Sequence, residues 1–324
     1  MEVTQARLPI AIRHEQAHHN EFLVINWCLG NTCNYSCSYC PEELHDASRP
    51  WVPYKTVTQF CERVLNHYRA QDGKRNIYFE FTGGEVSHYK DFINVLKFLK
   101  ERDVWTGMIS NGSKQLGWWQ EAKPFLDHAC ISYHPESAKL DHFKKVITYL
   151  NDSVTLHVNV MMLPEKFDEC LELARWVETE TENITLAIQP LLKNFSDVMY
   201  PYTPEQKSKL ETQTFNIKFT RPIKTYRGRM VKVFADGATE ILTGPEMIAK
   251  RENRWAGWEC RVGLDELVID FKGDIYRAWC LEGGRIGNVG MPSIAFPEKP
   301  VICKRDFCHC VLDVMNDRRA ATNA

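Results

Sequence analysis

Three cysteines lie close together near the amino end of the chain, in the segment CNYSCSYC at positions 33–40. Cys33, Cys37 and Cys40 are separated by three and then by two residues. Such a short segment can direct three thiolates at one metal centre. A structural zinc site or an ordinary iron–sulfur cluster takes four protein ligands. The segment therefore indicates a metal site and raises the question of why it supplies three ligands rather than four.

A second group of cysteines lies near the carboxyl end, at positions 260, 280, 303, 308 and 310. Cys28 ends an apolar run, and Cys61, Cys130 and Cys170 are scattered, so these four are interpreted as buried structural residues. The opening segment has no apolar signal region, which predicts a cytoplasmic protein whose thiols stay reduced. Two cysteine groups in that compartment indicate metal sites rather than disulfides.

Composition excludes several classes of function. The chain has 324 residues and a net charge of −2, so it has no basic field of the kind that binds nucleic acid, and a nucleic-acid substrate is disfavoured. No apolar run approaches the roughly 20 residues that cross a bilayer. The length allows one large domain and a smaller one.

The elements that must position the first cysteines alternate between strand and helix. This alternation predicts a parallel sheet with right-handed crossovers. Apolar runs predict strands over 22–28, 76–82, 104–110, 128–134, 154–162 and 184–190. Helical periodicity predicts helices over 55–70, 88–101, 115–125, 138–150 and 165–180.

The pattern changes after about residue 195, where a proline-containing stretch reads as a linker that can open a short helix. Asp236-Gly237 and Lys272-Gly273 then predict two antiparallel hairpins. The chain is therefore expected to divide into an N-terminal extension, a β/α domain, a linker or barrel completion, and a small cluster-binding domain. The expected ranges are 1–20, 21–195, 196–228 and 229–324.

Polar or glycine-rich residues lie within or just beyond the carboxyl-terminal part of every one of the six predicted strands. In a parallel β/α barrel the carboxyl ends of the strands carry the chemistry. Any one of these residues could simply form a turn, but six such ends on one rim predict a site. Beyond the cysteines, they are Gly83, Gly84, Glu85, Ser110, Asn111, Ser132, His134, Asn159 and Gln189.

These motifs resemble those of the radical SAM superfamily over residues 22–190. The resemblance rests on CNYSCSYC, with Tyr39 as its aromatic residue, and on TGGE one strand later. It implies an α/β fold with a partial (β/α)₆ TIM-like barrel. It also implies a [4Fe–4S] cluster on Cys33, Cys37 and Cys40 whose open iron binds S-adenosylmethionine. One-electron cleavage of this cofactor would give a 5′-deoxyadenosyl radical that abstracts a hydrogen atom from the substrate.

The resemblance also implies roles for individual residues. Gly83 and Gly84 would let the backbone approach the methionyl group, and Glu85 would bind its ammonium. His134 is a candidate proton donor or acceptor in catalysis, alongside Glu85, although it could equally be a hydrogen-bonded wall residue. The remaining implied contacts to adenine, ribose, methionyl carboxylate or substrate are Tyr39, Ser110, Asn111, Ser132, Asn159 and Gln189.

The carboxyl-terminal cysteines resemble the auxiliary-cluster domains called twitch and SPASM. Five cysteines are too few for two fully ligated clusters, so one auxiliary [4Fe–4S] cluster is expected in a small antiparallel β-hairpin-containing domain. The expected ligands are Cys260, Cys280, Cys308 and Cys310, with Cys303 as substitute or spare. The gap from Gly273 to Cys280 is longer than the usual pattern, and a zinc site that includes His309 is the alternative.

The expected function is hydrogen abstraction from a small-molecule, amino-acid-like or nucleotide substrate, followed by oxidation or coupling of the substrate radical with help from the auxiliary cluster. Flavodoxin or ferredoxin is the expected electron donor. The alternatives are a redox-neutral isomerase or epimerase, a peptide-modifying enzyme, and a non-enzymatic iron–sulfur electron carrier. Only 32 residues precede Cys33, which favours a small substrate over a peptide.

Overall fold

A computed structural model of the chain describes residues 8–71, 76–193 and 198–321. The chain forms two compact units. The first unit combines residues 1–26, 59–78 and 225–324, and the second combines residues 27–58 and 79–224. The predicted domain ranges stay predictions, because compactness does not identify a cluster-binding domain. Residues 1–7 of the predicted N-terminal extension lie outside the described residues.

The second unit is built on parallel strands that follow one another in the sheet in chain order. The pairs β4–β5, β5–β6 and β6–β7 are parallel. Residues 27–28 of β2 and 79–82 of β3 belong to this unit. The strands are β2 (Phe22–Cys28), β3 (Asn76–Thr82), β4 (Trp105–Ser110), β5 (His128–Tyr133), β6 (Thr155–Met162) and β7 (Ile184–Pro190).

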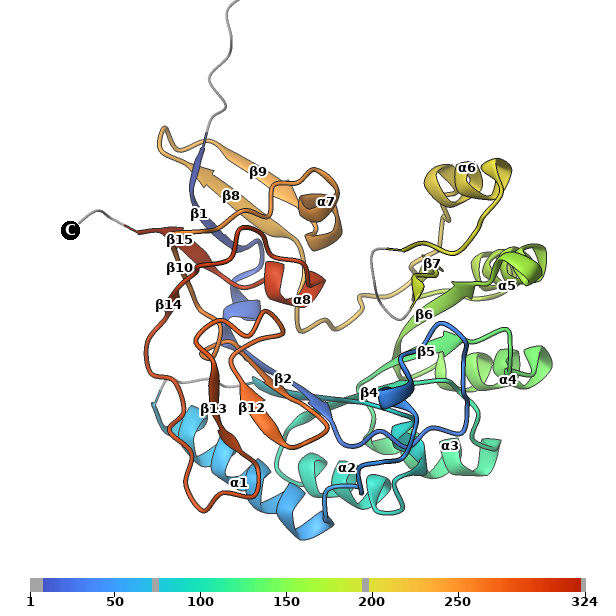
Figure 1. Ribbon diagram of the computed structural model, residues 1–324, viewed down its shortest axis with the longest axis horizontal. Coiled ribbons are helices and arrows are strands. Elements are labelled where there is room, and N and C mark those ends of the chain that lie inside the picture. The colour runs from blue at the N-terminus through green and yellow to red at the C-terminus, as the bar shows by residue number, and fades with distance from the viewer. Residues whose placement is uncertain (1–7, 72–75, 194–197, 322–324) are drawn as a thin grey trace, which may run out of the picture. The chain divides into compact units, whose positions relative to one another are not determined.

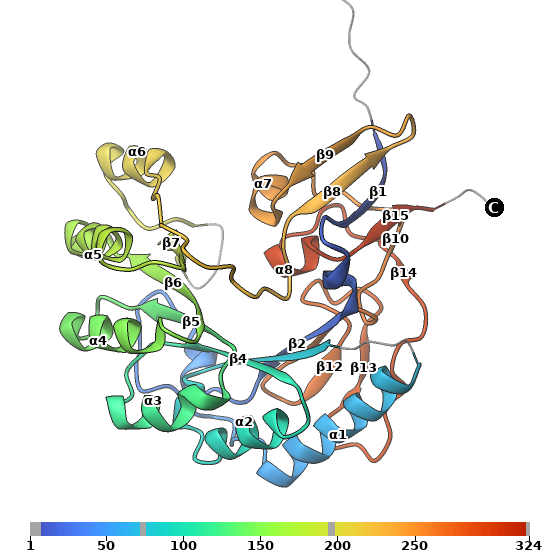
Figure 2. The ribbon, with the colours of Figure 1, turned by 180° about the vertical axis from the view of Figure 1, so that it is seen from behind.

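Amphipathic helices cover one side of strands β4 to β7 (Figures 1 and 2). In α4, the buried residues Phe143, Val146, Ile147 and Leu150 recur at helical spacing and form one apolar stripe. The α-helices are α2 (Phe92–Lys100), α3 (Leu116–Ala122), α4 (Leu140–Leu150), α5 (Phe167–Glu180) and α6 (Pro204–Thr212). Short 3₁₀ turns are η2 (Glu42–Leu44), η3 (Val86–His88), η4 (Lys123–Phe125) and η5 (Pro164–Lys166).

Strand β6 shows how the sheet separates its two faces. Its buried residues Leu156, Val158, Val160 and Met162 alternate with partly exposed ones. Because successive side chains point to opposite faces of a strand, one face carries the apolar set and the other carries His157 and Asn159. The helices cover the apolar face, so the polar face is available for a site.

The first unit contains a six-stranded antiparallel sheet in the order β14-β10-β15-β1-β8-β9. Its strands are β1 (Pro9–His14), β8 (Met230–Phe234), β9 (Thr239–Leu242), β10 (Trp258–Cys260), β14 (Val301–Ile302) and β15 (Arg318–Ala320). The residues predicted as an N-terminal extension thus include a sheet strand, β1, which pairs with β8 and β15.

A second antiparallel group in this unit comprises β11 (Glu266–Ile269), β12 (Asp274–Tyr276) and β13 (Arg285–Asn288). The helices of the first unit are η1 (Ala17–Glu21), α7 (Gly244–Ala249), α8 (Val311–Val314) and most of α1 (Tyr54–Gln71), which begins in the second unit. Both predicted hairpins are present, as β8–β9 and β11–β12, and Gly237 and Gly273 have the positive φ that their turns require.

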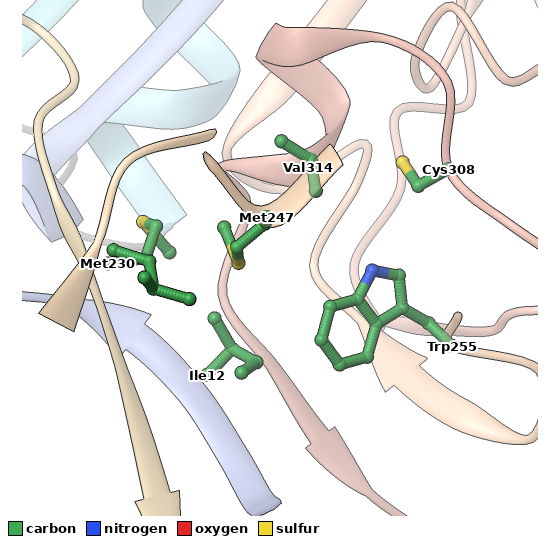
Figure 3. Packing of buried hydrophobic residues seen from close by; sticks show 7 residues of the cluster. Ile12, Met230, Met247, Trp255, Cys308 and Val314 are labelled. Carbon is green, nitrogen blue, oxygen red and sulfur yellow. The ribbon is translucent and has the colours of Figure 1, made fainter. Parts of the chain in front are cut away.

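One hydrophobic cluster holds the six-stranded sheet and the short helices of this unit together. It contains Ile12, Met230, Met247, Trp255 and Val314, and Cys308 lies at its edge beside the Trp255 indole (Figure 3). A carboxyl-terminal cysteine is therefore anchored to the core of the unit.

The predicted fold class is confirmed: the chain is an α/β protein with parallel strands, covering helices and an antiparallel part that contains the predicted hairpins. All six predicted strands of the parallel sheet are present, with ends that differ by at most one residue from the prediction. None of the helices formed by the described residues combines the length and the apolar character needed to cross a bilayer.

Candidate functional site

The segment that leads into the first cysteines is held by backbone hydrogen bonds to the segment after β3. The N–H of Gly84 donates to the carbonyl of Gly30 at 2.9 Å, and the N–H of Glu85 donates to the carbonyl of Thr32 at 2.8 Å. A Cβ atom on Gly84 would lie 2.2 Å from the Thr32 oxygen. Gly83 has a φ of 129°, and a Cβ there would lie 2.3 Å from the Gly30 oxygen. The two glycines thus allow the cysteine loop to pack directly on this turn.

The three cysteines of the loop lie in largely apolar surroundings. Cys37 is buried, Cys33 and Cys40 are half-buried, and Cys37 and Cys40 pack with Leu163 and Leu191. Burial, with a smaller contribution from the charge of Cys33, raises the pKa of Cys37 to about 12 and that of Cys40 to about 11. Burial also raises the pKa of Cys33. Metal-free thiols in this loop therefore stay protonated at neutral pH, and metal binding must displace their protons.

Donor groups are directed at the Cys33 sulfur. The N–H of Tyr35 lies 3.4 Å from Cys33 Sγ, and Asn111 Nδ2 lies 3.9 Å from it. Asn111 Nδ2 also donates to Asn34 Oδ1 at 2.9 Å. The end of β4 thus contacts the cysteine loop directly. Such donors favour the thiolate form that binds metal.

Glu85 joins the ends of β3 and β4. Its side chain is 1% exposed, and its Oε1 accepts hydrogen bonds from Ser110 Oγ at 2.9 Å and from the N–H of Ser87 at 3.1 Å. Its Oε2 accepts from the N–H of Asn111 at 2.6 Å. Burial raises the pKa of Glu85, and these hydrogen bonds oppose that rise. A buried carboxylate at this position is a candidate acceptor for a cation such as an ammonium.

His134 and Tyr39 form a pair beside the loop. Tyr39 OH lies 2.8 Å from His134 Nδ1, and the two rings are stacked with centroids 5.9 Å apart. Cys37 Sγ lies 3.6 Å from the same nitrogen. Burial lowers the pKa of His134 to about 4, which keeps the imidazole neutral at physiological pH. His134 is thus a neighbour of Cys37, and its predicted catalytic role stays a prediction.

The polar face of β5, β6 and β7 carries a second hydrogen-bond network. Asn159 Oδ1 lies 2.9 Å from His157 Nε2 and 3.2 Å from Gln189 Nε2. Asn159 Nδ2 donates to Cys130 Sγ at 3.1 Å, and His157 Nδ1 lies 2.8 Å from Thr185 Oγ1. The predicted residues Asn159 and Gln189 therefore meet, and Ser132 lies opposite Asn159 in the strand register.

Cys130 and Thr185 in this network were not predicted as site residues. Cys130 is isolated in the sequence and was interpreted as structural. Burial and then the charge of Glu80 raise its pKa to about 12, so it is a protonated thiol. The sequence did hold a signal for Cys130: it lies two residues before the predicted site residue Ser132, and alternate residues of a strand share a face.

The carboxyl-terminal cysteines meet at a small cavity in the first unit. Four of the five line it together with Arg318, Arg305, Asp313, Glu282 and Val262; these four are Cys260, Cys280, Cys303 and Cys308. Cys310 is not among the lining residues. The structure therefore brings the predicted ligands Cys260, Cys280 and Cys308 together with the predicted spare, Cys303, rather than with Cys310.

Hydrogen bonds donated by their own backbone N–H groups fix three of these cysteines. The N–H of Cys280 donates to Asp313 Oδ2 at 2.6 Å, and the N–H of Cys303 donates to the carbonyl of Trp258 at 2.8 Å. The N–H of Cys308 donates to the carbonyl of Asn253, also at 2.8 Å. Burial raises the pKa of Cys308 to about 12 and also raises the pKa of Cys260 and Cys280.

The donor sets fit iron–sulfur clusters in kind and number. Among the residues that the structure describes, no three His, Cys, Asp or Glu side chains converge closely enough to hold a single metal ion. In a [4Fe–4S] cluster each thiolate binds a different iron, so its ligands surround a cube rather than a point. His309 is exposed and packs on Phe307, with ring centroids 4.2 Å apart, and it does not line the cavity.

The solved structures that the chain resembles include three with bound S-adenosylmethionine (AdoMet). Native anSMEcpe with bound AdoMet superposes with a TM-score of 0.51 at 13% identity over 83% of this chain and 78% of that chain. Streptococcus suis SuiB bound to S-adenosylmethionine gives 0.49 at 16% identity over 83% of this chain, and BtrN in complex with AdoMet and 2-DOIA gives 0.42 at 12% identity over 83% of this chain and 78% of that chain. The chain spans 64% of the length of SuiB.

No family model and no curated protein matches the chain. The likeness to anSMEcpe establishes the fold, a parallel α/β partial barrel of the kind that the sequence motifs implied.

Proposed function

We propose that this chain is a radical SAM enzyme that binds S-adenosylmethionine at a [4Fe–4S] cluster held by Cys33, Cys37 and Cys40. The observation that carries the proposal is the direct packing of the cysteine loop on the Gly83-Gly84-Glu85 turn. This packing unites two motifs that lie more than forty residues apart in the sequence. An iron–sulfur electron carrier would need the cysteines but not a buried carboxylate beside them.

The residues of the chain would divide the work of holding the cofactor. The three thiolates would bind three irons and leave the fourth for the amino and carboxylate groups of S-adenosylmethionine. Glu85 would accept the ammonium in a charge-assisted hydrogen bond. Ser110 and Asn111 would hold Glu85, and Asn111 would also orient Cys33. Tyr39 would lie beside the adenine. When bound, the cluster and S-adenosylmethionine would supply a one-electron cleavage that yields a 5′-deoxyadenosyl radical for hydrogen abstraction.

The polar face of the sheet favours a neutral or cationic small substrate. Apart from histidines, strands β3 to β7 contain one charged residue, Glu80, and neither lysine nor arginine. Phosphates and carboxylates are usually held by arginine, lysine or helix N-termini. An amine, hydroxyl or amide would instead find partners in Glu80, His157, Asn159 and Gln189. An amino-acid-like or polyol substrate is therefore favoured over a nucleotide that carries phosphates.

The carboxyl-terminal cavity would hold one auxiliary [4Fe–4S] cluster on Cys260, Cys280, Cys303 and Cys308. The support is that these four cysteines line one cavity and Cys310 does not. Such a cluster suits the removal of an electron from a substrate radical, so net oxidation or radical coupling is the preferred reaction type. A redox-neutral isomerase is the second candidate, favoured by the protonated Cys130 thiol on the polar face. The enzyme would act in the cytoplasm with flavodoxin or ferredoxin as reductant.

Iron content and spectroscopy test this proposal. Anaerobically reconstituted protein is expected to hold about eight irons, and replacement of Cys33, Cys37 and Cys40 by Ala should leave about four. Adding S-adenosylmethionine to the reduced wild-type protein should change the electron paramagnetic resonance (EPR) signal of the cluster that the triple variant lacks. A signal that does not respond to S-adenosylmethionine would contradict the proposal. About four irons with one zinc per wild-type chain would contradict the auxiliary cluster only.

A further inference from the structure

The cavity of the carboxyl-terminal cysteines contains a buried positive charge. Arg318, at the start of β15, lines the cavity with Cys260, Cys280, Cys303 and Cys308 and is only 4% exposed. Its guanidinium lies over the Trp255 indole at 4.9 Å from the ring centroid. Cys260 and Cys308 are the thiols whose charge acts on it most strongly. The side chain is thus held in place by the core and faces the sulfur atoms.

Arg318 has hydrogen-bond partners but, among the described residues, no carboxylate partner. Its Nε donates to the carbonyl of Asn316 at 3.1 Å, and its Nη2 donates to the carbonyl of Asp313 at 2.6 Å. Other arginines of this unit form ion pairs, such as Arg261 with Asp265 at 2.7 Å. Arg318 is therefore a buried cation whose charge is not neutralised by an Asp or Glu side chain of the described residues.

The two carboxylates that line the cavity are engaged elsewhere. Asp313 accepts the N–H groups of Trp279 and Cys280 at 3.2 and 2.6 Å. Glu282 accepts the N–H of Lys304 at 3.2 Å and faces Arg305 at 3.9 Å. Behind them, the buried Glu266 accepts from Asn316 Nδ2 at 2.5 Å. None of the three forms an ion pair with Arg318.

A buried charge without a partner is costly, whereas a paired one is tolerated. Four protonated thiols would leave Arg318 unpaired. Four thiolates on a [4Fe–4S] core would give a group with a net charge of about −2, which would supply the missing partner. The cavity is thus suited to an anionic metal–thiolate group and would be strained without one.

We propose that Arg318 is the built-in counter-charge of the auxiliary cluster and raises its reduction potential. This inference rests on the auxiliary cluster of the proposed function. Reduction adds one negative charge to the cluster, and a nearby fixed cation in a low-dielectric site stabilises the more negative state. Arg318 therefore makes the cluster a better electron acceptor. It is a positioning and tuning residue and takes no part in bond breaking.

The test uses the protein with Cys33, Cys37 and Cys40 replaced by Ala, so that only the carboxyl-terminal cluster contributes. In this background, R318Q removes the charge and keeps N–H donors for the two carbonyls, and R318K keeps the charge. R305Q is the matched control, because Arg305 lines the same cavity but its side chain is half exposed and faces Glu282. Iron content and the midpoint potential from an EPR-monitored redox titration are measured for each protein.

The expected result is a more negative midpoint potential for R318Q, a value close to the parent for R318K, and a smaller shift for R305Q. Loss of iron in R318Q with retention in R318K would also support the counter-charge. Loss of iron in both variants, an unchanged potential in R318Q, or an equal shift in R305Q would overturn it. If the parent triple variant binds no iron while wild type holds its first cluster, the auxiliary cluster itself is refuted.

Discussion

Glu85 is the residue on which most contacts of the candidate site converge. It accepts hydrogen bonds from Ser87, Ser110 and Asn111, and its own N–H donates to the cysteine loop at Thr32. Glu85, Ser110 and Asn111 could be assigned to one rim from the strand pattern alone, because each lies at the carboxyl end of a predicted parallel strand. The hydrogen bonds themselves could not be predicted, since they depend on how far each turn extends beyond its strand.

Replacing Glu85 by Gln should weaken the binding of S-adenosylmethionine about tenfold or more and leave the iron content unchanged. The amide cannot form a charge-assisted hydrogen bond with the ammonium, and such bonds contribute roughly 1.5–3 kcal/mol. Affinity is measured by anaerobic titration of the reconstituted protein. Glu121→Gln is the control, because Glu121 is exposed on α3. An affinity equal to that of the control would show that Glu85 does not bind the cofactor.

Among the secondary-structure elements, the central contact is the one between the loop after β2 and the turn after β3. A Gly-Gly-Glu sequence after a strand predicts a tight turn, but the packing of both glycines on Gly30 and Thr32 appears only in the structure. The strands β1 and β15 were missed for a similar reason. Ala11 and Ile12 of β1 pair with Arg319 and Arg318 of β15 at the other end of the chain, and β15, with only three residues, has no periodicity to detect.

Gly84→Ala should disrupt the cysteine loop. The new Cβ would approach the Thr32 oxygen to 2.2 Å, so the backbone must shift, at a cost of about 1–3 kcal/mol. We expect the variant to lose the first cluster and keep about half of the iron. Gly117→Ala is the matched control, because no atom lies within 4 Å of its added Cβ. Full iron content in Gly84→Ala would contradict the role given to this contact.

The ion pairs of Lys232 in the β8–β9 hairpin should make the stability of the protein depend on pH. Lys232, whose side chain is 7% exposed, forms ion pairs with Glu240 at 2.7 Å and with Glu252. The hydrogen bond from Lys232 lowers the pKa of Glu240 below its ordinary value. A lowered folded-state pKa adds stability above the unfolded-state pKa, and this stability is lost as the pH falls through the folded-state value.

Lys232→Met should therefore destabilise the protein by about 1 kcal/mol near pH 7, and the difference from wild type should shrink as the pH falls below about 4.3, the ordinary glutamate pKa. Urea unfolding at several pH values measures the difference. Lys250→Met serves as control, since Lys250 is exposed and contacts Glu240 only at 3.5 Å. A difference that stays constant with pH would show that Lys232 acts through packing instead.

At the scale of the whole molecule, two cysteine groups serve two compact units. The first group lies in the second unit and the second group in the first unit. Both groups could be recognised from the sequence, because the spacing of the cysteines does not depend on where the predicted strands end. The sequence could not select four ligands among the five, because Cys303 and Cys310 have the same thiol group and both lie near Cys308 in the sequence. Only the structure distinguishes them, since Cys303 lines the cavity and Cys310 does not.

Formation of 5′-deoxyadenosine tests the central claim most directly. Wild-type protein is reduced anaerobically with S-adenosylmethionine, and the nucleoside is measured by liquid chromatography beside the triple cysteine variant and Cys280→Ala. The account predicts release by wild type, none by the triple variant, and slow release by Cys280→Ala if that variant keeps the first cluster, because cleavage needs only that cluster. A wild-type protein that holds about eight irons but releases no 5′-deoxyadenosine would contradict the account and favour an electron carrier.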